Sequence, residues 1–149
     1  MVKKGRGIWL VVAGVAAAVL LLIVLLCRTE KKPERYYQFS AENAVSVTVR
    51  NCESGKGYTF SRAGGAGREL EAIMQYAAQG SFRRTAEAKG CVCLYELTFY
   101  NMLGEELDSF FVISDTELLR QNYVYESGNN GNQELISYLD TLFGVDRAG

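Results

Sequence analysis

The sequence predicts an α+β protein, with an N-terminal transmembrane helix followed by an antiparallel sheet and two helices packed on one face. An uncharged apolar run over residues 8–27 predicts the transmembrane helix. Several later stretches alternate apolar and polar residues, as half-buried strands do. Two more stretches repeat apolar residues at helical spacing. Because short turns separate the expected strands, we expect antiparallel pairing and helices that cover one face of the sheet.

The run IWLVVAGVAAAVLLLIVLLC at 8–27 would reach about 30 Å as a helix, the thickness of a bilayer's hydrocarbon core. Trp9 lies at one end, where an aromatic ring typically anchors at the interface. A basic tail at 1–7 precedes the run, and a charged linker at 28–35, which contains Pro33, follows it. We therefore expect a single-pass anchor whose partner is the lipid bilayer.

Two other interpretations of the run remain open. A cleaved signal peptide has an apolar region of ~7–15 residues and a small-residue cleavage site, whereas this run is longer and ends in LLCRTE. A lipoprotein signal places a small residue before the lipidated cysteine, but Leu26 precedes Cys27. A basic N-terminal tail is costly to move outward against the membrane potential. The expected location is the cell membrane, with the C-terminal domain extracytoplasmic.

The domain that follows is expected over 36–144, with a patternless tail at 145–149. It is long enough to bury a core of its own. Its strands are expected at 45–49, 58–60, 82–85, 91–100, 105–114 and 119–125, the last as a short hairpin about Gln121 and Asn122.

Two amphipathic helices are expected within this domain. The first is marked by apolar residues at i, i+3, i+4 and i+7 and ends at Gly80. The second closes the domain. Their apolar faces comprise Leu70, Ile73, Met74 and Ala77 in the first helix, and Leu135, Ile136, Leu139, Leu142 and Phe143 in the second.

Four segments carry a resemblance to a known group of proteins. They are VSVTVRN with SGKGYTF, LYELTFYNMLGEELDSFFVI, QNYVYE and ELISYLDTLFG, which together cover most of residues 44–144. In this arrangement the chain resembles small membrane-tethered or lipoprotein extracytoplasmic domains of unknown function from Gram-positive bacteria. The resemblance implies a tethered domain outside the cytoplasm and brings no catalytic or binding residues with it.

The amino-acid composition excludes several kinds of catalytic and metal-binding site. The chain has no histidine, which excludes Ser-His-Asp triads, Cys-His dyads and histidine-ligated metals. Its formal net charge of -1 gives no basic balance that would favour nucleic acid. We expect no cofactor, no metal and no small-molecule substrate.

Cys52, Cys91 and Cys93 are the candidate reactive side chains of the domain. Three thiolates lack the fourth ligand of a structural zinc site. The alternatives are a disulfide from Cys52 to Cys91 or Cys93, or reduced and buried thiols, and the latter is slightly favoured. Cys91 and Cys93 are not expected to bond to each other, because residues i and i+2 of one strand lie ~6.6–6.8 Å apart.

Two further groups resemble functional sites but are expected to be structural. The glycine-rich segment RAGGAGRELE precedes a helix, yet it lacks the lysine and hydroxyl residue of a phosphate-binding loop. The carboxylates of Glu96, Glu105, Glu106 and Asp108 fall on one hairpin. We expect a flexible loop and a solvated face, respectively, because spacing on a hairpin does not establish the two-carboxylate geometry of a glycosidase.

Tyr100, Tyr123 and Tyr125 are candidates for an exposed aromatic patch, and such patches mark partner surfaces. Ordinary packing of tyrosines on a sheet is the alternative.

The function expected from these observations is a non-enzymatic, membrane-anchored extracytoplasmic module that binds another protein of the cell envelope. One alternative is an exported enzyme or a thiol or metal protein that uses Cys52, Cys91 and Cys93. Another is a cytosolic domain on an anchor of reversed orientation.

Overall fold

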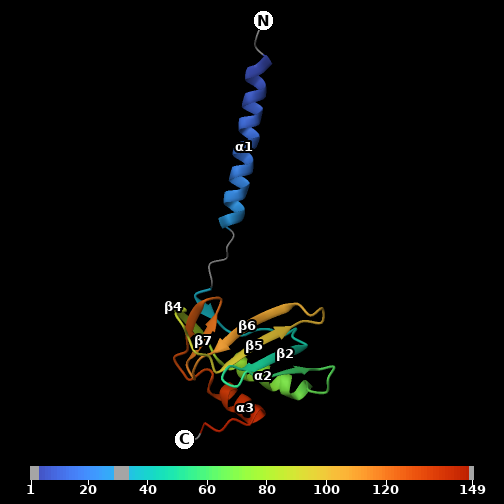
Figure 1. Ribbon diagram of the computed structural model, residues 1–149, viewed down its shortest axis with the longest axis vertical. Helices are drawn as coiled ribbons and strands as arrows, with labels where there is room; N and C mark the ends of the chain where they lie inside the picture. Colours follow the sequence, from blue (N-terminus) through green and yellow to red (C-terminus); the bar gives the residue numbers. More distant parts are fainter. Residues whose placement is uncertain (1–3, 29–33, 148–149) are drawn as a thin grey trace. The chain divides into compact units, whose positions relative to one another are not determined.

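The computed structural model describes residues 4–28 and 34–147; in the first helix it describes the side chains of 11–23. The chain divides into two units, residues 1–34 and 35–149, and each is described by itself (Figure 1). The elements in order are α1 (Lys4–Arg28), β1 (Tyr36–Tyr37), β2 (Ser46–Asn51), β3 (Gly57–Ser61), α2 (Gly67–Gln79), β4 (Phe82–Glu87), β5 (Tyr95–Tyr100), β6 (Glu106–Val112), β7 (Glu117–Arg120), β8 (Tyr123–Glu126) and α3 (Gln133–Phe143).

The predicted transmembrane helix over residues 8–27 is corrected by the structure. In the part of the chain that the structure describes, no helix is both long and apolar enough to cross a membrane. The predictions of a single-pass signal anchor and of an extracytoplasmic placement on that anchor are corrected with it.

The second unit confirms the α+β class. Its strands form one antiparallel sheet in the order β1-β4-β8-β7-β6-β5-β2-β3. Neighbours in the middle of the sheet are joined by short turns, as in the β7–β8 hairpin. Gln121 and Asn122 form that turn, both with positive φ (50° and 65°). Two such residues give the turn whose twist matches that of the flanking strands.

The sheet is strongly curled at its β1 end. The Tyr37 hydroxyl donates a hydrogen bond to Asp108 Oδ2 at 2.7 Å, although β1 and β6 are four positions apart in the sheet order. In a flat sheet these strands would lie about 19 Å apart. The contact therefore requires the sheet to curl, so that the inner side of β1 approaches the inner side of β6.

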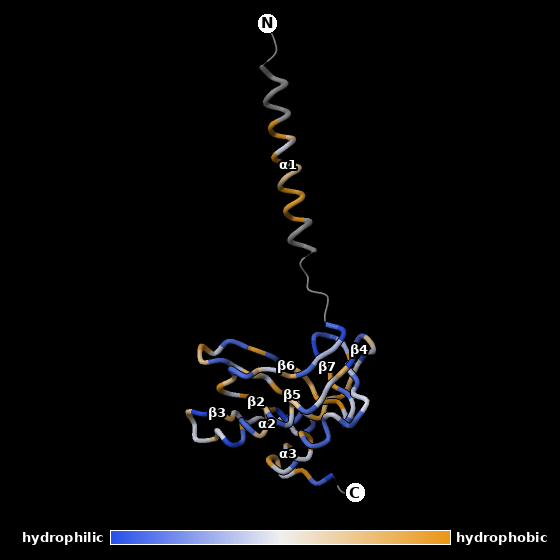
Figure 2. The backbone as a smooth tube through the Cα atoms, turned by 180° about the vertical axis from the view of Figure 1, so that it is seen from behind, coloured by the Kyte–Doolittle hydropathy of each residue, from blue (hydrophilic) through white to orange (hydrophobic). Residues whose placement is uncertain are grey.

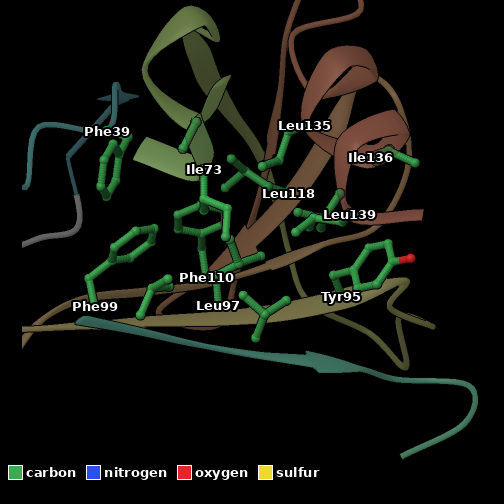
Figure 3. Packing of buried hydrophobic residues seen from close by; sticks show 14 of the residues in the cluster. Phe39, Ile73, Tyr95, Leu97, Phe99, Phe110, Leu118, Leu135, Ile136 and Leu139 are labelled. Carbon is green, nitrogen blue, oxygen red and sulfur yellow. The ribbon is translucent and has the colours of Figure 1, made fainter. Parts of the chain in front are cut away.

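The core lies between the inner face of the sheet and the two helices (Figure 3). Leu97 and Phe99 of β5 point from the sheet toward Ile73 of α2 and Leu139 of α3, and all four side chains are fully buried. Phe39, from the segment between β1 and β2, packs on Phe99 with ring centroids 4.4 Å apart. Burying aromatic and branched apolar side chains of this kind is the main favourable term in folding.

Two elements differ from the strands expected from the sequence. β5 begins at Tyr95 rather than at residue 91, and β1, which is only two residues long, was not expected at all. The segment before β5 instead reaches across to the end of β2, where Cys52 N–H donates to the Leu94 carbonyl at 2.9 Å.

Candidate functional site

The turn between β5 and β6 is held rigidly by one side chain. Asn101 Oδ1 accepts hydrogen bonds from the backbone N–H groups of Leu103 (2.9 Å) and Glu105 (3.0 Å). Asn101 Nδ2 donates to Glu105 Oε2 at 2.8 Å. Gly104 supplies the positive φ of 75° that closes the turn. The turn is thus a defined structure, since asparagine commonly organises turns by bonding backbone groups a few residues ahead.

Apolar side chains project from this turn into solvent. Met102 is 86% exposed, Leu103 is 82% exposed and Leu107 is 40% exposed. Figure 2 shows the tip of the β5–β6 hairpin in the colour of hydrophobic residues, where the hairpin projects from the sheet. We call Met102, Leu103 and Leu107 the tip surface.

A β-bulge places Leu107 in this group. The register pairs Phe99 with Asp108 and Tyr100 with Glu106, so Leu107 is the extra residue of β6. Bulges re-aim a side chain without ending the strand. Here the bulge presents an apolar side chain near the hairpin end.

A shallow hollow of about 400 Å³ lies beside the tip surface. It is formed by the segment before β2, the residue after β3 and the hairpin turn. Its lining residues are Glu42, Asn43, Ala44, Val45, Arg62, Asn101, Met102 and Leu103. Around the hollow and the turn, Glu42, Glu105 and Glu106 outnumber Arg62, so this corner of the domain is net acidic.

The structure does not bring Tyr100, Tyr123 and Tyr125 together on one surface. Tyr125 is fully buried on the inner face of the sheet. Tyr123 shares that face, is half-buried and lies under the Arg84 guanidinium, 5.0 Å from the ring centroid. Tyr100 follows Phe99 in β5 and therefore points to the opposite face, because successive side chains of a strand alternate.

Among the cysteines, Cys52 and Cys93 form a disulfide with their Cα atoms 5.8 Å apart. It joins the end of β2 to the segment before β5. Cys91 keeps a free thiol and is exposed. The described residues include no group of three or more Cys, Asp or Glu side chains placed to hold a metal ion.

The carboxylates of the β5–β6 hairpin are separated by the sheet. Glu96 lies on the outer face and accepts from Arg50 Nε at 2.7 Å. Asp108 lies on the inner face with Tyr37, and Glu105 bonds to Asn101 in the turn. Acids placed on opposite faces do not converge on one substrate, as glycosidase chemistry would require.

The best-formed polar cluster of the inner face is Tyr37, Asp108 and Arg120. Arg120 Nε donates to Asp108 Oδ1 at 2.9 Å, and its guanidinium lies 4.7 Å from the centre of the Tyr37 ring. Burial, reinforced by the neighbouring Asp108 charge, raises the pKa of Tyr37 well above its usual value. Asp108 Oδ1 also accepts from the Ser109 backbone N–H at 2.9 Å. Because Tyr37 and Arg120 both bond to Asp108, the cluster joins β1 and β7 to β6.

The glycine-rich segment leads directly into α2. Gly65 has a φ of 80°, the Gly64 N–H donates to Ser61 Oγ at 3.0 Å, and α2 begins at Gly67. The loop therefore makes a tight turn from β3 into the helix.

No family model matches the chain, and the searches of curated proteins and of solved structures also gave no match. The candidate site is therefore defined by its own geometry.

The tip surface was missed in the sequence because NMLG looks like an ordinary turn. The available signal was the pair Met102-Leu103, two adjacent large apolar residues where turns normally carry polar ones.

Proposed function

We propose that this protein is a non-catalytic binding module that docks on a partner protein through the tip surface. The supporting observation is the combination of very high exposure of Met102 and Leu103 with the hydrogen-bonded order of the turn that carries them. Isolated exposed apolar residues are common and need no special cause. Adjacent ones on a rigid projection lose little conformational entropy on binding, which favours affinity.

The charge around the tip surface suggests the chemistry of the partner. Glu105 and Glu106 follow the apolar pair in the hairpin, and Glu42 lines the same hollow as Met102 and Leu103, with Arg62 as the opposing charge. A matching surface is an apolar pocket that receives Met102 and Leu103 and is bordered by lysine or arginine. The same acids disfavour an anionic lipid surface.

The alternative of a thiol or metal protein has less support. Cys52 and Cys93 are bonded to each other, so only Cys91 offers a free sulfur among the cysteines that the structure describes in the domain. Tight zinc binding by the oxidised protein, at one ion per chain, would favour the alternative.

Site-specific photo-crosslinking in the native cells tests the proposal. A photoreactive residue at Met102 should give a discrete adduct with a different protein, and excess unlabelled protein should suppress it. The same residue at Val92, which is 83% exposed but lies outside the tip surface, is the matched control. The adduct should also weaken when Glu42 and Glu106, which are both exposed, are changed to Lys.

Three results would contradict the proposal. One is no adduct at Met102, and another is equal adducts at Met102 and Val92. The third is an adduct made only with lipid or with a second copy of the chain. The substitutions at these exposed positions should change stability by no more than ~0.5 kcal/mol, so unfolding does not confuse the result.

A further inference from the structure

The two edges of the sheet are unequal. β1 is two residues long, whereas β3 runs from Gly57 to Ser61 and, among the described strands, pairs with β2 alone. β3 contains no proline and no charged residue, and its register with β2 is continuous. Charges, prolines, bulges and short length are the usual devices that stop an edge strand from accepting another strand. Within its own length β3 has none of them.

The hydrogen bonds at the ends of the β2–β3 pair fix which backbone groups face outward. Asn51 N–H donates to the Lys56 carbonyl at 2.8 Å, and Arg62 N–H donates to the Val45 carbonyl at 3.2 Å. Because bonded pairs alternate in an antiparallel ladder, Tyr58 and Phe60 bond toward β2. The backbone N–H and C=O of Thr59 then point away from the sheet.

This outward edge is accessible. Thr59 is exposed, and among the described residues no segment outside the sheet bonds to its backbone. The edge ends at Ser61, whose carbonyl accepts from the Ala66 N–H at 3.2 Å. The part of β3 that is open to pairing is a few residues long, which is enough for a short added strand.

Side chains around the edge restrict what can be added. Tyr58 is 48% exposed, and its ring lies 4.9 Å from that of Phe143, on the inner side of the sheet. An added strand would extend this apolar layer with every second side chain. Lys56 and Arg62 are exposed immediately before and after β3 and would face acidic groups at the two ends of that strand.

The same charges disfavour a second copy of the chain. Antiparallel pairing of two β3 strands about Thr59 would place Lys56 of each copy opposite Arg62 of the other. Like charges directly opposite each other destabilise a strand pair. We propose that β3 is a strand-addition site for an extended segment of a partner protein, with apolar residues at alternate positions and an acidic residue at each end.

This site is separate from the tip surface and goes beyond the proposed function. Strand addition draws its affinity from main-chain hydrogen bonds and its specificity from alternate side chains. The two sites approach each other at Arg62, which also lines the hollow beside Met102. Lys56 is therefore the better residue for a specific test.

The test uses the full chain and a synthetic seven-residue peptide with glutamate at both ends, opposite Lys56 and Arg62, and valine at positions 3 and 5. Binding should slow hydrogen exchange of the Thr59 amide at least tenfold, as read by NMR. The same peptide with lysine ends should bind at least tenfold more weakly. The glutamate-ended peptide N-methylated at the residues that face β3 should not bind.

Variants test whether the peptide binds at the edge of β3. Lys56→Glu should weaken binding of the glutamate-ended peptide several-fold, whereas Arg83→Glu, exposed on β4 near the opposite edge in the strand order, should not. Met102→Ser should leave peptide binding unchanged. A negative result for strand addition can therefore be told apart from a negative result for docking through the tip surface. Absence of Thr59 protection, equal binding of both peptides, or dimerisation through β3 would overturn the proposal.

Discussion

At the scale of single residues, Asp108 shows how one carboxylate joins distant parts of the sheet. Its two oxygens accept from Tyr37 on β1 and Arg120 on β7, and its side chain and that of Arg120 are only 11% and 19% exposed. An ion pair this buried is costly to break from one side, because the remaining charge loses its partner.

Replacing Asp108 by Asn should therefore destabilise the domain by about 2–3 kcal/mol, near the lower limit for buried pairs. The matched change is Glu96→Gln, which removes the pair with Arg50, where the side chains are 27% and 53% exposed. That change should cost less than about 1 kcal/mol. Urea unfolding of both variants measures the difference, and equal losses would contradict the role given to Asp108.

Gly80 is constrained by close approach. A Cβ there would overlap the buried Phe82 ring and lie 3.0 Å from the Gly131 carbonyl oxygen. We expect Gly80→Ala to destabilise by ~1–3 kcal/mol through overpacking. Gly128→Ala, which meets nothing within 4 Å, should change stability by less than ~0.5 kcal/mol. Thermal unfolding that ranks the two variants in the reverse order would refute this.

The raised pKa of Tyr95 predicts that the domain loses stability at alkaline pH. Burial, together with the hydrogen bond to Asp140, raises the pKa of Tyr95 from 10.0 to about 12. Its stabilising contribution is therefore complete below pH ~10 and is lost as pH rises toward ~12, because the unfolded chain gives up the phenolic proton first.

Urea midpoints measured from neutral pH to about pH 11 should accordingly fall more steeply for the wild type than for Tyr95→Phe. Tyr37 also carries a raised pKa, so part of the slope should remain in the variant. Identical slopes for wild type and Tyr95→Phe would contradict the assignment.

At the scale of elements, local periodicity was a good guide where packing follows it. The apolar face expected for the first amphipathic helix contains Leu70, Ile73 and Ala77, which are the buried residues of α2. Alternation at Val47 and Val49 likewise matches the buried side of β2. Elements that depend on distant partners were not predictable in this way, and β1 is one of them because only its pairing with β4 defines it.

The start of β5 shows a second limit. Cys91, Val92 and Cys93 alternate in the sequence as a strand would, but Cys91 and Val92 are exposed and Cys93 bonds to Cys52. A covalent link between segments 41 residues apart cannot be read from periodicity. From the sequence, a disulfide from Cys52 and fully reduced thiols were both open, and reduced thiols were slightly favoured.

The disulfide should stabilise the domain by restricting the unfolded chain. Changing Cys52 and Cys93 together to Ser should cost ~2–4 kcal/mol, because the bond closes a loop of intermediate length. Cys91→Ser should change stability by less than ~0.5 kcal/mol, since Cys91 is exposed and free. Non-reduced peptide mapping checks the connectivity, and a Cys91-containing bond would contradict it.

At the scale of the whole molecule, the proposal of a binding module rests on the contrast between a satisfied polar cluster and an exposed apolar turn. The polar groups of Tyr37, Asp108 and Arg120 bond to one another, while Met102 and Leu103, which are 86% and 82% exposed, lie side by side on a rigid turn. The α+β class was predictable because it follows from alternation and helical spacing. The tip surface was not, since exposure and order of a turn depend on hydrogen bonds such as those of Asn101.

The central claim is that Met102 and Leu103 contribute most of the binding energy. The most direct test is calorimetric titration of the full chain with the protein captured at Met102. Met102→Ser with Leu103→Ser should weaken binding about 30-fold or more, because interface hot spots contribute ~2 kcal/mol or more. Val92→Ser should bind as the wild type does. Unchanged affinity of the double variant, or an equal loss in Val92→Ser, would contradict the account.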